Sequence, residues 1–144
     1  MGFNYEYDPI SQISGMIDDF DAIRDKIPEA MEDAVDASAK IILESQKRLV
    51  PVKTGVLKRS LARYFKKKDG KVMEYIGVDF GKYPEVRGRA VSNEFGRRGG
   101  TSKSGKRIAP MRASPYIRAG FDASAESAAQ KAAEVFLDKV GFNK

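Results

Sequence analysis

The sequence predicts an α+β domain, in which long helices near both ends of the chain flank a β-hairpin or small antiparallel sheet. Residues 10–50 and 114–140 carry apolar residues at helical spacing. Between them, two short segments rich in aromatic and β-branched residues flank Asp69 and Gly70. An Asp-Gly pair is a strong signal for a two-residue hairpin turn. The length of 144 residues fits one domain with a sizeable core.

The N-terminal part predicts two helices separated by a proline. Asp8 followed by Pro9 is a typical helix opening, with a cap and then a first-turn proline. Pro28 is expected to interrupt this helix. A second helix over residues 28–50 should end where Pro51 and Gly55 follow. The apolar stripes of the two helices contain Ile10, Ile13, Ile17, Phe20 and Ile27, then Met31, Ala34, Val35, Ser38, Ile41, Ile42, Ser45 and Leu49.

The second half predicts a hairpin, a loop and a closing helix. The hairpin strands cover residues 60–66 and 71–78, whereas residues 80–95 fit either a helix or an extended segment. Tyr64 and Phe65 fit either a surface that stacks on single-stranded nucleic acid or the core of the hairpin, and we favour the core. Residues 97–107 contain no apolar side chain, so we expect a mobile basic loop. The last helix should open at Ser114 and Pro115. Gly120 inside it costs about 1 kcal/mol relative to alanine, which indicates tight backbone packing or a break.

Composition excludes most familiar catalytic chemistry. The chain has no cysteine and no histidine, so disulfides, Cys or His zinc sites and histidine-dependent triads are ruled out. Gly100, Gly105 and Lys106 fit only the first part of a phosphate-binding loop, because Arg107 stands where a Ser or Thr is needed. We expect Glu94 to form salt bridges with neighbouring arginines. We therefore predict no enzyme, and no catalytic, cofactor or metal site.

Targeting signals are also missing from the sequence. No apolar run is long enough to span a bilayer, and the first residues do not resemble a signal peptide. We expect synthesis in the cytoplasm of the cell that makes the protein, and no membrane partner.

Charge is divided unevenly along the chain. Residues 1–36 carry ten acidic and two basic residues, whereas residues 37–81 carry eleven basic and four acidic, and residues 82–118 ten basic and two acidic. Such a division serves a nucleic-acid partner, or it lets the acidic end of one subunit meet the basic middle of the next. We favour the second interpretation.

Three segments in fixed order carry a family resemblance: P-x-x-T-G-x-L-x-x-S at residues 51–60, E-F-G at 94–96, and S-P-Y-I at 114–117. With the elements around them, these segments resemble those of the tail-component family of tailed bacteriophages and prophages. Members of this family are small neck proteins that take part in head-tail joining and tail completion. The resemblance covers residues 28–140. Its motif residues are Pro51, Thr54, Gly55, Leu57, Ser60, Glu94, Phe95, Gly96 and Pro115.

The same residues also have architectural interpretations. Thr54 can cap a short turn entered through Gly55, and Leu57 can anchor that turn to the core. Ser60 would begin the first strand. Phe95 suggests an aromatic anchor, and Gly96 a residue with positive φ where the chain leaves the core.

The resemblance implies a structural virion protein of the phage neck, made in the bacterial host. It would join the head connector to the tail-terminator or tail-tube proteins as a ring subunit around the DNA channel, in a hexamer or dodecamer. Residues 1–27 would be an acidic helical extension, and residues 28–144 the neck-protein domain. Arg97 stands where family members often have Thr or Ser. The cations of the basic loop would contact an acidic partner or, non-specifically, the channel DNA: Arg97, Arg98, Lys103, Lys106 and Arg107.

The alternative is a basic nucleic-acid-binding accessory protein, which the cationic middle of the chain supports. Salt-dependent binding of DNA by the isolated protein distinguishes the two functions.

Overall fold

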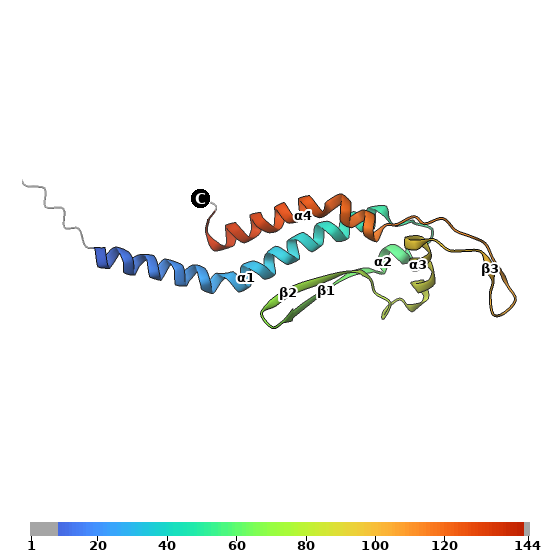
Figure 1. Cartoon of the computed structure of the whole chain (residues 1–144), viewed down its shortest axis with the longest axis horizontal. Helices are drawn as coiled ribbons and strands as arrows, with labels where there is room; N and C mark the ends of the chain where they lie inside the picture. Colours follow the sequence, from blue (N-terminus) through green and yellow to red (C-terminus); the bar gives the residue numbers. More distant parts are fainter. Residues whose placement is uncertain (1–8, 143–144) are drawn as a thin grey trace, which may run out of the picture.

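The computed structural model describes residues 9–142, and the side chains of residues 14–142. In chain order the elements are α1 (Pro9–Leu49), α2 (Val56–Arg59), β1 (Leu61–Lys68), β2 (Lys71–Val78), the 3-10 turn η1 (Pro84–Val86), α3 (Arg87–Phe95), β3 (Gly100–Thr101), β4 (Arg107–Ile108) and α4 (Ile117–Val140). This order confirms the predicted α+β class. Figure 1 shows an elongated molecule, with α4 on one side of α1 and the β1–β2 hairpin on the other.

The predicted interruption at Pro28 is wrong, because α1 is one continuous helix with Pro28 inside it. A proline removes one backbone hydrogen bond and bends a helix, and α1 does change direction part-way along its length (Figure 1). The helix on both sides of Pro28 in the sequence is continuous, and α4 packs against it just after the proline. Ala30 is fully buried, and Lys139 of α4 pairs with Glu29 at 2.7 Å and Asp33 at 2.9 Å. The predicted cap Asp8 lies outside the described residues, as do the side chains of Ile10 and Ile13.

α1 and α4 pack closely because small residues line their interface. Gly120, Ser124 and Ala128 are the buried residues one turn apart on α4. A Cβ atom on Gly120 would lie 2.7 Å from the Cα atom of Gln46, so the two backbones are in contact there. Of the two alternatives for Gly120, the structure confirms tight packing, and the helix continues unbroken.

The hairpin has the predicted turn, and its first strand runs two residues closer to that turn than predicted. β1 and β2 pair antiparallel from Leu61 opposite Val78 to Lys68 opposite Lys71. Asp69 and Gly70 form the turn with φ of 52° and 72°, the positive values that such a turn needs. Tyr64 and Phe65 are both about half exposed, so their predicted place in the hairpin core is wrong. The reason is that this sheet has only two strands, so much of its surface, including these two rings, has no neighbouring element to cover it.

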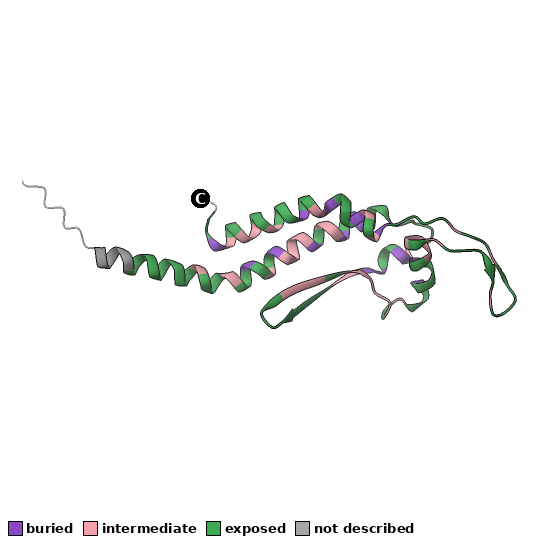
Figure 2. Ribbon diagram, viewed as in Figure 1, coloured by how far each residue is buried: buried purple, intermediate pink, exposed green. Residues whose placement is uncertain are grey.

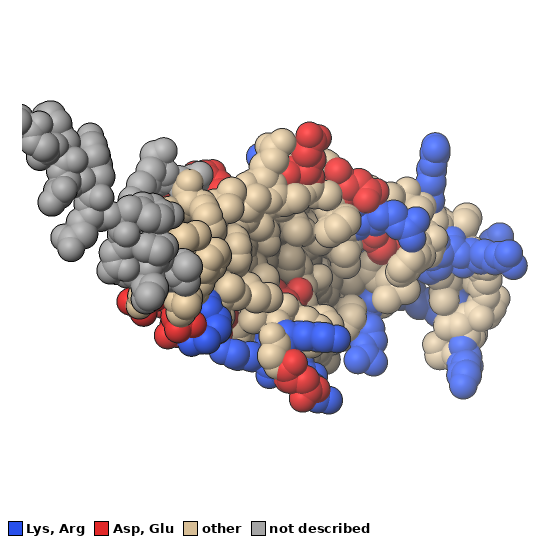
Figure 3. Space-filling model, turned by 60° about the vertical axis from the view of Figure 1, so that its left-hand side comes forward, with Lys and Arg blue, Asp and Glu red and all other residues tan. Residues whose placement is uncertain are grey.

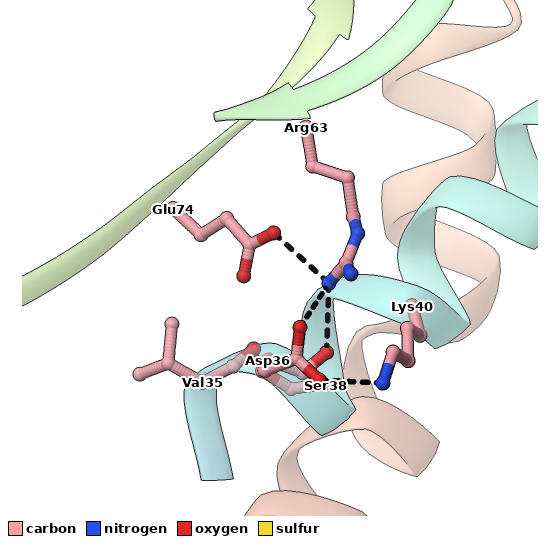
Figure 4. A network of polar contacts seen from close by, with 6 residues as sticks. All are labelled: Val35, Asp36, Ser38, Lys40, Arg63 and Glu74. Carbon is pink, nitrogen blue, oxygen red and sulfur yellow. Dashed lines mark hydrogen bonds and ion pairs between the residues drawn. The ribbon is translucent and has the colours of Figure 1, made fainter. Parts of the chain in front are cut away.

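A polar network holds the hairpin on α1 (Figure 4). Arg63 of β1 donates to the Asp36 carboxylate at 2.6 Å and pairs with Glu74 of β2 at 3.0 Å. Lys40 pairs with the other oxygen of Asp36 at 2.6 Å. Hydrogen bonds from Lys40 and Arg63 hold the pKa of Asp36 below its usual value. Closer to the tip, Lys67 pairs with Glu32.

The main core lies where the end of α1, the base of the hairpin, α3 and the start of α4 meet. Its buried members are Leu43, Val50, Leu57, Leu61, Val86, Ala90 and Tyr116. The core is small, and purple, buried positions in Figure 2 are confined to this region and to the contact between α1 and α4. The N-terminal third of α1 and the β3–β4 arm therefore extend from opposite ends of the packed body (Figure 1).

Candidate functional site

The three motif segments of the sequence meet at this core. α2 lies within the first motif and buries Leu57, which is 3% exposed. α3 ends in the second motif, and α4 begins in the third. The packing of these segments positions two features on the surface, an arm and a groove, which are described below.

Glu94 joins α3 to α4 by capping a helix that begins elsewhere in the chain. One carboxylate oxygen accepts the backbone N–H groups of Tyr116 and Ile117, both at 2.9 Å, and the other accepts that of Arg118 at 3.0 Å. Burial alone would raise the pKa of Glu94, but the three backbone donors outweigh it and lower the pKa. The expected salt bridges of Glu94 are thus replaced by a cap, because α4 begins at Ile117 without a side-chain cap of its own.

Tyr116 lies directly beneath this cap and is fully buried. Burial, together with the nearby Glu94 charge, raises the pKa of its hydroxyl to about 12. Tyr116 is therefore a neutral core residue at physiological pH, and we assign it a structural role.

The arm is a β-ribbon and not the loop without secondary structure that the composition predicts. Arg97 and Met111 exchange two backbone hydrogen bonds of 2.8 Å at its base. Farther out, Gly100 pairs with Ile108 and Thr101 with Arg107. A ribbon needs only backbone pairing, so a segment without apolar side chains can still form one. We call residues 97–111 the basic arm.

Gly96 sets the direction in which the arm leaves the body. Its φ is 76°, and a Cβ atom there would lie 3.0 Å from the backbone of both Ala113 and Met111. Beside it, the Ser114 N–H donates to the Asn93 carbonyl at 2.7 Å. The arm thus starts and ends at adjacent points of the body. Its five predicted contact residues are exposed: Arg97, Arg98, Lys103, Lys106 and Arg107. Figure 3 shows blue, basic side chains gathered at this end of the molecule.

The groove is an open, mostly apolar hollow of about 650 Å³ between α1, β2, α3 and the start of α4. Figure 3 shows an uncharged, tan hollow of this kind with acidic atoms in its floor. We call it the apolar groove. Its lining residues are Ile42, Gln46, Glu74, Tyr75, Ile76, Val78, Phe80, Ala90, Val91, Glu94, Phe95, Ile117, Arg118 and Phe121.

Glu74 and Gln46 supply most of the polar chemistry of the groove. Glu74 has a side chain only 5% exposed, and its Oε1 atom pairs with Arg63. The other oxygen of Glu74 and the Oε1 atom of Gln46 are buried without a hydrogen-bond partner within the described part of the chain. Burial raises the pKa of Glu74, although Arg63 partly opposes this effect.

The motif residues have different positions in this structure. Gly55, with φ of 72°, is itself the residue before α2. Thr54 is exposed, so the expected Thr54 cap is wrong, because the cap position belongs to a residue without a side chain. Ser60 is fully buried, donates to the Leu57 carbonyl at 2.8 Å, and immediately precedes β1.

Phe95 is 69% exposed and lines the apolar groove, so its expected role as a core anchor is wrong. Pro51 and Pro115 are exposed, and α4 begins two residues after Pro115. The groove was not predicted from the sequence. The residues that could have indicated it are Phe121 and Phe95, two large aromatic residues that the neighbouring helices leave uncovered.

The fold and its charges define a class: a small α+β protein with two projecting segments of opposite charge. The model of the family described as "Bacteriophage HK97-gp10, putative tail-component" matches residues 14–96, and the chain belongs to this HK97-gp10-like family of phage tail components. It is thus a structural protein of the virion and not an enzyme. A comparison with curated proteins gave no match, and neither did one with solved structures.

The matched range contains two of the three motif segments, and the basic arm and α4 lie beyond it. Among the described residues, no group of three or more acidic side chains is placed to hold a metal ion. No helix within residues 9–142 is both long and apolar enough to cross a membrane.

Proposed function

We propose that this tail component is a subunit of a ring in the phage neck, where it joins the head connector to the tail-terminator or tail-tube proteins around the DNA channel. The observation that carries the proposal is the placement of opposite charges on two segments that project from opposite ends of the packed body (Figure 1). Six or twelve copies would form the ring.

The acidic segment is the exposed part of α1 formed by residues 14–27, which we call the projecting helix. It carries Asp18, Asp19, Asp21 and Asp25 against two cations, Arg24 and Lys26. The basic arm lies at the other end. A subunit with complementary and different ends associates head to tail, and such association closes into a ring when the rotation between neighbours allows it.

Immunogold electron microscopy of particles made by the phage or prophage that encodes the chain tests the position. We expect label at the head-tail junction. Label along the tail tube, or no label on intact particles in which a known neck epitope is accessible, would contradict the neck position.

The function of the basic arm can be tested by neutralising its exposed cations together, with glutamine at Arg97, Arg98, Lys103, Lys106 and Arg107. We expect unjoined heads and tails and a loss of infectivity. A matched control neutralises Lys66, Lys67 and Lys68 at the tip of the other hairpin, and it should keep particles intact. Equal infectivity of the arm variant and the wild type would exclude the arm from joining.

The same arm supports the second candidate, an accessory protein that binds nucleic acid, because its cations are exposed on a ribbon. That function requires the isolated protein to bind DNA with submicromolar affinity that falls steeply with salt. A structural joint requires no such affinity. Binding of this strength, lost in the arm variant, together with absence from particles, would favour the accessory function.

The division into an extension of residues 1–27 and a domain of residues 28–144 belongs to this proposal. Deleting residues 1–27 should leave the circular dichroism of the remaining domain intact and weaken oligomerisation. Unchanged assembly of the shortened chain would contradict docking through the projecting helix.

A further inference from the structure

The apolar groove presents more hydrophobic surface than its surroundings within the described chain can cover. Tyr75, Val91, Phe95 and Phe121 line it, and each is between 48% and 69% exposed. They come from three different elements and face one hollow. A contiguous apolar surface rimmed by polar residues is typical of a binding site for another protein segment.

The floor of the groove specifies what the occupant must carry. The Oε2 atom of Glu74 and the Oε1 atom of Gln46 are both acceptors, and both are buried without a donor within the described residues. Leaving a buried acceptor without a donor is unfavourable. An occupant therefore needs apolar side chains to fill the groove and at least one hydrogen-bond donor to reach its floor.

The projecting helix carries this combination. Ile17 and Phe20 are 54% and 65% exposed, and Met16 beside them is 59% exposed. Arg24 follows Phe20 by four residues, so Ile17, Phe20 and Arg24 lie on one face of α1. This face presents two apolar side chains followed by a donor, although the Arg24 guanidinium pairs with Asp21 at 2.9 Å within its own helix. Both groups are exposed, so Arg24 would exchange this partner for the groove at little cost. An amphipathic helix placed with such a face in an apolar groove is a recurrent mode of recognition.

Charges around the two surfaces also match. The projecting helix carries Asp21 beside its apolar face, whereas Asp18 and Asp19 lie farther round the helix. The groove is edged by Arg118, and the guanidinium of Arg87 lies 5.2 Å from the centre of the Phe80 ring in its wall. Asp21 would thus meet basic residues at the rim of the groove, and the other two carboxylates would add to the general attraction between the two surfaces.

The projecting helix cannot occupy the groove of its own chain. Phe20 and Gln46 belong to the same continuous helix, and at 1.5 Å per residue they lie about 39 Å apart along its axis. The helix therefore has to come from a second copy. We infer that the projecting helix of one copy lies in the apolar groove of the next copy, with Ile17 and Phe20 in the hollow and Arg24 toward Glu74.

This inference gives the proposed ring its subunit contact, and it rests on that proposed function. The contact is heterologous, because helix and groove are different surfaces, and each subunit has one of each. It therefore propagates from copy to copy until the ring closes.

Cysteine cross-linking tests the contact directly, because the chain has no cysteine of its own. Met16→Cys places a thiol beside the helix face, and Val91→Cys places one in the groove. Both positions are about half exposed, and the anchors Ile17 and Phe20 are kept. The double variant is treated with a short bis-maleimide, as purified protein and within assembled particles. We expect covalent dimers and higher multiples, and a 1:1 mixture of the two single variants should give one dimer band.

Two controls make the result specific. Met16→Cys combined with Tyr64→Cys, on the exposed part of the hairpin, should give little cross-linking. In the Met16→Cys, Val91→Cys background, Phe20→Asp should abolish the multiples. Ala22→Asp should not, because Ala22 is exposed and lies on the opposite face of the helix from Phe20.

The contact is overturned if neither preparation cross-links, if the Tyr64 pairing cross-links equally well, or if Ala22→Asp has the same effect as Phe20→Asp. The neck position is judged separately. Gold label at the head-tail junction without this cross-link would leave the proposed function in place and refute only the contact, whereas label elsewhere would refute the neck position itself.

Discussion

Replacing Gly120 with alanine is expected to destabilise the protein, although alanine is the better helix former. The added Cβ atom would lie 2.7 Å from both the Cα and Cγ atoms of Gln46 and 2.8 Å from its backbone nitrogen. Carbon atoms in contact prefer about 3.5–4.0 Å, so α1 and α4 would have to separate by about 1 Å. A rotamer change can move the Cγ atom, but it cannot move the backbone atoms of Gln46.

The magnitude follows from two opposing effects. Overpacking a close interface costs about 1–3 kcal/mol. Removing a glycine from a helix interior recovers about 1 kcal/mol. Because the clash is with backbone, we place the cost near the upper end of that range and expect a net loss of about 2 kcal/mol. For a domain of this size, that loss lowers Tm by roughly 7 °C.

Thermal and urea unfolding followed by circular dichroism at 222 nm, at one fixed protein concentration, measures the loss. Gly88→Ala is the matched control, because Gly88 is a helical glycine in α3 whose Cβ atom would meet nothing within 4 Å. It should stabilise the protein by about 0.5–1 kcal/mol. If Gly120→Ala proves as stable as the wild type, or behaves like Gly88→Ala, the close approach of the two helices is not as described.

Three further substitutions test the core and the two carboxylates. Leu57→Ala should lower the free energy of unfolding, measured in urea, by about 2–5 kcal/mol. Leu49→Ala, on the exposed end of α1, should lower it much less, and equal losses would contradict the burial of Leu57 in α2. Glu94→Gln should cost about 1–2 kcal/mol at neutral pH, because the cap of α4 loses its charge. The pKa of Glu94 is lowered in the folded state, so its charge stabilises the fold above the ordinary pKa of 4.5. This stabilisation is lost as pH falls through the folded pKa, and the free energies of unfolding of wild type and variant should therefore converge in acid. Glu74→Gln should have the opposite pH dependence, because burial raises the pKa of Glu74 in the folded state. The wild type then loses stability as pH rises from 4.5 through the folded pKa, so the variant should become more stable relative to the wild type over this range. Parallel pH profiles would contradict either assignment.

The hairpin could be predicted from the sequence, and the close approach at Gly120 was one of two alternatives that the sequence left open, because each depends on local chemistry. Asp69 and Gly70 favour positive φ whatever surrounds them, and a glycine inside a helix needs a compensating contact. Pro28 misled the prediction because the helix around it packs against α4, whose Lys139 is more than a hundred positions away in the sequence.

The arm, the cap and the groove could not be predicted because each depends on how distant segments meet. Backbone pairing forms the arm, and no side-chain pattern reports it. Glu94 caps a helix that begins more than twenty residues later, and nothing near Ile117 shows that its N–H groups are satisfied from α3. Phe95 and Phe121 are apolar, but only the packing of four elements shows that both are left at the surface.

The hydrogen bonds at the base of the arm make the stability of the body independent of the length of the arm. Arg97 and Met111 are joined by two backbone hydrogen bonds, and Ser114 is tied to Asn93 just behind them. Residues added at the outer turn, between Ser104 and Gly105, would therefore leave α3 and α4 undisturbed, and the entropy of closing a longer loop grows only slowly with length. The length of the arm can therefore change without redesign of the domain. The same turn is where a peptide tag can be inserted to report on this end of the subunit in an assembled particle.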